Sequence, residues 1–132
     1  MMDEKIKGHF LGLYQMIISD TEVHPKELEL LYQIGKEKGI SEQDIQNAIL
    51  SPNNFVSADL LNDDEKIEHL FDLARMAWAD GVLDDREIQS MNSACKRLGF
   101  LEEYVDEISN FLLEQAKAGK NINDVLKTIN NL

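Results

Sequence analysis

The sequence has very little of what would place it outside the cell or within a membrane. Cys95 is the only cysteine among 132 residues, so no disulfide can form within the chain and a reducing compartment is favoured. No run approaches the roughly 20 apolar residues of a membrane-spanning helix. The opening stretch, MMDEKIKGHFLGLYQMIISD, has acids where a signal peptide carries positive charge, and Gln15 interrupts its apolar run. We therefore expect a cytoplasmic protein with no segment inserted in a membrane.

Basic residues are also scarce. The chain has 13 lysines and arginines against 25 aspartates and glutamates, which gives a formal net charge of −12. Such a charge repels nucleic-acid phosphates and anionic membrane surfaces, which proteins usually bind through Lys and Arg. Divalent cations and basic protein surfaces are the partners that this charge favours. The alternative is that the acidity serves solubility alone, and nothing in the charge pattern indicates an oligomeric state.

Only two prolines interrupt the chain, and no alternation of polar and apolar residues suggests a strand. Apolar residues instead recur at helical spacing, which predicts helices with one buried face. The clearest stripe comprises Ile67, Leu70, Phe71, Ala74, Ala77 and Trp78. A similar stripe contains Phe10, Leu13 and Ile17. The fold class that this pattern predicts is all-α.

Capping signals set the expected helix boundaries. Residue pairs such as Asn62 with Glu65 and Asp84 with Glu87 are typical of helix starts, and Gly39 and Gly99 are typical of helix ends. They predict seven helices in one compact domain over residues 1–132. The expected ranges are roughly 3–19, 25–38, 42–51, 63–79, 85–98, 101–118 and 123–131.

An offset of 60 residues aligns the two halves of the chain without a gap. Six pairs are identical between 10–40 and 70–100: Leu13/Leu73, Met16/Met76, Asp20/Asp80, Glu27/Glu87, Lys36/Lys96 and Gly39/Gly99. Apolar matches are expected between any two amphipathic helices, but the polar matches are not. We interpret them as an internal duplication with pseudo-two-fold symmetry. Its repeat units are about 3–50 and 63–118, followed by a final helix at 123–131.

The duplicated acids are the candidate binding residues. Each half has an Asp after a long helix, Asp20 or Asp80, and a Glu in the first turn of the next helix, Glu27 or Glu87. Together with Asp84, these carboxylates could hold a divalent metal ion, since hard cations such as calcium take several oxygen ligands. The alternative is structural. The aspartates would then accept hydrogen bonds from the following turn, and the glutamates would stabilise the positive ends of helix dipoles.

The same residues carry a family resemblance. The stretch MAWADGVLDDREIQSMNSACKRLGF resembles the tellurite-resistance protein B (TerB-like) family through Asp80, Gly81, Glu87 and Gly99. The first half matches less well, because Thr21 replaces the glycine. The resemblance implies a seven-helix, two-half fold, an acidic surface suspected of binding metal ions, and a link to tellurite and metal stress. An EF-hand is not indicated, because positions three, six and twelve counted from Asp80 are Val82, Asp85 and Met91.

Enzymatic chemistry finds little support in the residues. Cys95 lies on an apolar stripe, which predicts a buried, inert thiol, and no glycine-rich phosphate loop or serine elbow is present. His9 and His69 align across the repeat; we interpret them as partly buried histidines on helix surfaces, with a paired proton-handling role as the alternative. We therefore expect a non-catalytic module that binds a divalent cation or a basic protein partner. The alternatives are a scaffold whose acids are only structural and, more remotely, a carboxylate-dependent hydrolase.

Overall fold

The structure is a computed structural model, and it describes residues 4–18, 25–50, 61–79 and 81–130. These residues form helices and no strands, as the sequence predicts. The helices are α1 (Glu4–Ile18), α2 (Pro25–Glu37), α3 (Glu42–Ile49), α4 (Asp63–Ala77), α5 (Asp85–Arg97), α6 (Glu102–Lys117) and α7 (Ile122–Asn130). Each lies within a few residues of its expected range.

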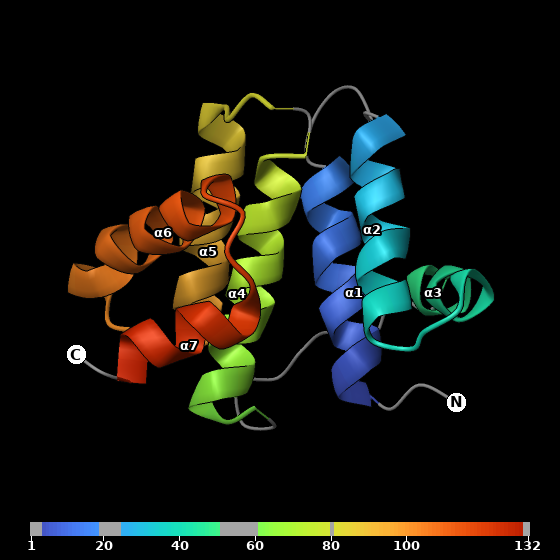
Figure 1. The fold of residues 1–132 in the computed structure, drawn as a ribbon, viewed down its shortest axis with the longest axis horizontal. Coiled ribbons are helices and arrows are strands. Elements are labelled where there is room, and N and C mark those ends of the chain that lie inside the picture. The colour runs from blue at the N-terminus through green and yellow to red at the C-terminus, as the bar shows by residue number, and fades with distance from the viewer. Residues whose placement is uncertain (1–3, 19–24, 51–60, 80, 131–132) are drawn as a thin grey trace.

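Two long helices occupy the centre of the molecule, and the others pack around them. Helices α1 and α4 lie side by side, with α2 and α3 against α1 and with α5, α6 and α7 against α4 (Figure 1). This arrangement forms one compact all-α domain. The internal duplication stays a prediction from the sequence.

Local sequence signals explain where the helices begin and end. Asn62 and Glu65 form a reciprocal capping box at the start of α4. The chain leaves α2 and α5 through Gly39 and Gly99, whose φ angles of 76° and 92° lie in the left-handed region that glycine adopts without strain. Gly81, with φ at 83°, makes the turn after α4.

The core is continuous between the two central helices and the surrounding ones. Phe10, Leu13 and Ile17 of α1 are fully buried. They pack in one cluster with the apolar face of α4, which includes Leu70 and Phe71. At its C-terminal end α4 is tied to α6, because Trp78 donates a hydrogen bond from Nε1 to the Leu113 carbonyl at 2.9 Å. Within the described ranges, no helix combines the length and the apolar character needed to span a membrane.

Candidate functional site

Asp84, one of the predicted cation ligands, is the N-cap of α5. Its Oδ1 accepts a hydrogen bond from the backbone N–H of Glu87 at 2.9 Å. This is the local bond that a helix start requires, because the first-turn N–H groups have no partner within the helix. One oxygen of this carboxylate therefore has a structural role.

Glu27 and Glu87 occupy matching places in the first turns of α2 and α5. Both are buried, with 5% and 7% of their surface exposed. Burying a carboxylate is costly unless its charge is balanced. The N-terminal end of a helix supplies part of that balance through its dipole. Two glutamates buried at equivalent positions are unusual in a chain whose other acids mostly face solvent.

Asp20 and Asp80 lie outside the described residues. Of the five predicted ligands, the structure links Asp84 with Glu87, through the cap bond from the Glu87 N–H to Asp84 Oδ1. Among the residues it describes, no group of three or more His, Cys, Asp or Glu side chains lies close enough to hold a metal ion. A cation site at these positions would therefore depend on the carboxylates of Asp20 and Asp80.

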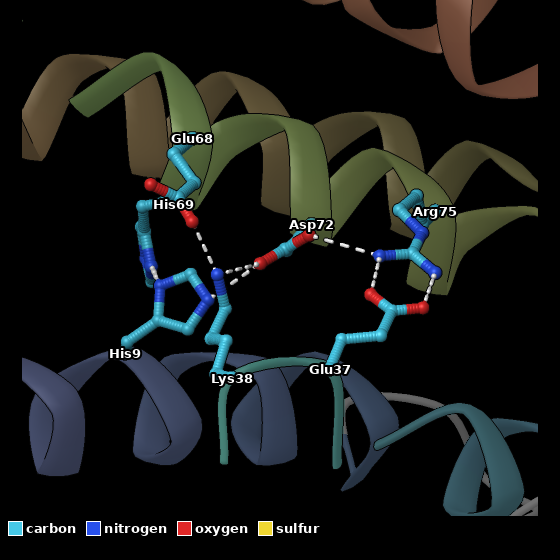
Figure 2. Close-up of polar contacts among 7 residues, drawn as sticks. All are labelled: His9, Glu37, Lys38, Glu68, His69, Asp72 and Arg75. Atoms are coloured by element: carbon cyan, nitrogen blue, oxygen red, sulfur yellow. Dashed lines mark hydrogen bonds and ion pairs between the residues drawn. The ribbon is translucent and has the colours of Figure 1, made fainter. Parts of the chain in front are cut away.

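A polar network that the sequence interpretation missed lies between the central helices, and Asp72 of α4 is its centre (Figure 2). The Asp72 side chain is only 4% exposed. Its Oδ2 accepts a hydrogen bond from Nε2 of His9, on α1, at 2.8 Å. Lys38 Nζ and Arg75 each lie 3.4 Å from its carboxylate oxygens. Burial alone would raise the pKa of Asp72, but the hydrogen bond from His9 and the nearby positive charges hold it below its ordinary value.

Two further carboxylates complete the pairing of the cations around Asp72. The Arg75 guanidinium binds both oxygens of Glu37 at 2.9 and 3.0 Å, which lowers the pKa of Glu37 and raises that of Arg75. Lys38, just after α2, pairs with Glu68 of α4. Burial alone would lower the pKa of Lys38, but the charge of Asp72 and the bond to Glu68 raise it. Each cation thus bridges two acids.

His9 and His69 contact each other directly, with their Nδ1 atoms 2.7 Å apart. Because an ionised Asp72 carboxylate can only accept, Nε2 of His9 carries the proton and donates to it. In a neutral His9 ring, Nδ1 then has no proton and accepts a hydrogen bond from the Nδ1–H of His69. Two neutral rings therefore satisfy both hydrogen bonds. Burial, reinforced by the neighbouring His9 ring, lowers the pKa of His69 well below its ordinary value of 6.5. The interpretation of His69 as a helix-surface residue is wrong, because its side chain lies between α1 and α4 and is 5% exposed.

The network is suited to holding helices together. It joins α1, the end of α2 and α4, and its central side chains are buried. A hollow of about 380 Å³ borders it. The charged residues that line this hollow are balanced: Glu37, Glu68 and Asp72 against Lys38, Arg75 and Lys120. Because most of these charges already pair with one another, the hollow offers little net charge to a ligand.

Cys95 is buried, as the sequence predicts. Its thiol lies 3.5 Å from the Ser109 hydroxyl, and burial raises its pKa. A buried thiol with a raised pKa is a weak nucleophile. This geometry gives a cysteine-based reaction no support.

The start of α6 presents a different kind of surface. Leu101 and Tyr104 are among the exposed large apolar side chains, at 62% and 49%. Tyr104, unlike Val105 beside it, does not contribute to the core. Four exposed acids lie next to Leu101 and Tyr104 in the sequence: Glu102, Glu103, Asp106 and Glu107. We call these six residues the α6 patch. Within the described residues its only ion pair joins Glu102 to Lys96 at 3.5 Å.

No protein-family model matches this chain, and no curated protein or solved structure matches it either. The resemblance to the TerB-like family therefore stays a prediction, based on the residues quoted from the sequence.

Proposed function

We propose that this protein is a non-catalytic, acidic, TerB-like module that binds a basic protein partner through the α6 patch. The observation that carries the proposal is the placement of Leu101 and Tyr104 among four exposed acids. Tyr is enriched among the residues that dominate binding energy, because it adds apolar area at low cost in conformational entropy. The acids would attract a cationic segment and set its orientation.

The balance of charges supports this choice of partner. The patch carries four acids, and Lys96 pairs with one of them. Glu103 and Glu107 lie one helical turn apart and form no ion pair within the described part of the chain. Two carboxylates at this spacing suit a segment that presents Lys or Arg beside an apolar side chain. The link to tellurite and metal stress that the resemblance implies would then reach this protein through its partner.

The test measures binding of a fluorescent basic peptide, such as one of alternating Lys and Leu, by anisotropy at increasing salt. We expect Glu103→Gln/Glu107→Gln and Tyr104→Ala each to weaken binding by about tenfold, or about 1.4 kcal/mol, more than most interface residues contribute. The matched control is Glu29→Gln/Glu42→Gln, which removes the same charge from exposed positions on α2 and α3. If this control weakens binding as much as the α6 variants do, the attraction is a property of the net charge and the α6 patch is not the site.

A divalent cation is the second candidate ligand, with a site formed by Asp20, Glu27, Asp80, Asp84 and Glu87. The observation that favours it is the matched burial of Glu27 and Glu87 at the starts of α2 and α5. A cation would balance such carboxylates and bring acids from both halves together. In the scaffold alternative, the same acids act only as helix caps, as Asp84 does.

Thermal melts with calcium, magnesium, manganese or zinc separate these two alternatives. A ligand that binds only the folded state stabilises it by about 2.7 kcal/mol at a hundredfold excess over its dissociation constant. We expect Asp80→Asn to abolish the metal-induced shift while barely changing the metal-free melt. If no metal shifts the melt, the cation site is excluded; a large loss of stability without metal would assign Asp80 a structural role.

A further inference from the structure

A groove with the opposite charge character lies between α1 and α5, over α4. It encloses about 520 Å³, a volume typical of ligand sites. A second hollow of about 230 Å³ shares Gly12, Gln15 and Arg97 with it, so the two adjoin each other. Helix α4 lies between α1 and α5 (Figure 1) and supplies Leu73 to the floor. We call the combined depression the α1–α5 groove.

The wall that α5 contributes contains two of the three arginines of the chain and no acid. Arg86, Ser90, Ser93 and Arg97 follow one another at helical spacing along one face of α5. Neither arginine forms an ion pair within the described residues, whereas Arg75 is held by Glu37 and Asp72. In a chain with 25 acids, a groove whose described lining residues include two arginines and no acid is a distinct electrostatic feature.

The rest of the lining suits a peptide backbone. Ser90 and Ser93 carry hydroxyl groups, and Gln15 and Gln89 carry amides; both groups donate and accept hydrogen bonds. A peptide backbone also presents donors and acceptors in turn, whereas a phosphate group only accepts in its ionised form. On the α1 side, Gly12 contributes to the lining, and the space where its Cβ would stand is taken by the His69 ring, whose Cε1 lies 2.9 Å from that position.

The spacing of the arginines indicates where the ligand carries its charges. Arg86 and Arg97 are eleven residues apart, which corresponds to about 16 Å along a helix. Carboxylates four residues apart on one face of an extended chain are separated by about 13–14 Å, which the flexible side chains of arginine and glutamate can bridge. The residue midway between them faces the same side, toward the apolar floor formed by Met16 and Leu73.

We propose that the α1–α5 groove binds a short acidic peptide segment in an extended conformation, with two carboxylates four residues apart and an apolar residue between them. The arginines bind the carboxylates, and the serine and glutamine side chains bind the peptide groups. The overall charge of −12 disfavours a long polyanion, because every negative charge beyond the two that pair is repelled by the protein. This site is separate from the α6 patch and does not depend on the function proposed for it.

The test uses a fluorescein-labelled peptide, Glu-Ser-Leu-Ser-Glu with an amidated C-terminus, and measures anisotropy with the full chain. A matched peptide with Gln in place of both Glu residues tests the need for carboxylates. We expect Arg86→Gln/Arg97→Gln to weaken binding of the Glu peptide by about tenfold or more, because both charge-assisted contacts are lost. The control Lys36→Gln/Lys127→Gln removes two exposed cations elsewhere and should change binding less than about twofold. Circular dichroism confirms that each variant is folded.

Three results would overturn the proposal. The first is no saturable binding of the Glu peptide up to about 1 mM, where the affinity becomes negligible. The second is equal binding of the Glu and Gln peptides, or binding that the arginine substitutions leave unchanged. The third concerns inorganic tripolyphosphate, added as a competitor: if it binds more tightly than the peptide and depends on the same arginines, the groove is a site for phosphate groups.

Discussion

Replacing Asp72 with asparagine tests whether the buried network holds the helices together. Asp72→Asn preserves the shape of the side chain but removes the charge that His9, Lys38 and Arg75 share. Lys38 keeps Glu68 as a partner and Arg75 keeps Glu37, so neither cation is left unpaired. The substitution therefore measures the contribution of the central carboxylate.

The expected magnitude follows from three contacts. The bond from His9 loses its charge assistance, which costs about 1 kcal/mol, since bonds to charged groups contribute about twice as much as neutral ones. Lys38 and Arg75 are about a quarter exposed, so each lost attraction at 3.4 Å is reduced by solvent and contributes about 0.5–1 kcal/mol. We expect Asp72→Asn to lower the free energy of unfolding by about 2–3 kcal/mol.

Urea unfolding at pH 7, followed by the fluorescence of Trp78, measures this change. The denaturant dependence should stay the same, so that the midpoint alone shifts. Glu29→Gln is the control, because Glu29 is exposed and its neutralisation should alter stability by less than about 0.5 kcal/mol. A loss below about 1 kcal/mol for Asp72→Asn, or one equal to that of the control, would refute the argument that the network joins α1, α2 and α4.

Two further predictions concern His69. Because burial lowers the pKa of His69 in the folded state, the unfolded state binds a proton first as the pH falls through 6.5. The free energy of unfolding should then decline by up to about 1.4 kcal/mol per pH unit. His69→Asn should remove this part of the pH dependence, measured by urea titrations between pH 7 and 5.5. Equal slopes for the two proteins would contradict the burial of a neutral ring. Gly12→Ala should destabilise the protein by about 1 kcal/mol despite the higher helix propensity of alanine, since the new Cβ would lie 2.9 Å from Cε1 of the His69 ring. In thermal melts, Gly12→Ala should lower the melting temperature less in a protein that already carries His69→Asn. An unchanged or higher melting temperature for Gly12→Ala alone would show that the His69 ring can move aside.

The helices could be predicted from the sequence because their signals are local. A cap needs a residue such as Asn62 and its partner three positions later, and an exit needs a glycine such as Gly39. The apolar stripe of the central helix α4 likewise needs only its own sequence. These features depend on neighbours within a few residues, so they can be read before the tertiary structure is known.

The network could not be predicted in the same way, because its members come from three helices. One signal was present: Asp72 stands between Phe71 and Leu73 in the helix that carries the clearest apolar stripe, and an acid buried there requires partners. That signal identifies Asp72 but not His9, Lys38 or Arg75 as its partners. The 60-residue alignment brought His9 and His69 together, yet it could not show that α1 and α4 pack with these rings in contact.

The arrangement of the arginines explains how one acidic chain can offer two surfaces of opposite charge. Arg75 is held by Glu37 and Asp72, whereas Arg86 and Arg97 line the α1–α5 groove. If binding depended only on net charge, Glu103→Gln/Glu107→Gln would weaken binding of a basic peptide and strengthen binding of an acidic one to similar degrees. Two local sites predict otherwise. With two local sites, the glutamate substitutions should weaken chiefly the binding of the basic peptide, and the arginine substitutions should weaken chiefly the binding of the acidic peptide. Measuring both peptides with both variants therefore distinguishes local recognition from a general electrostatic effect.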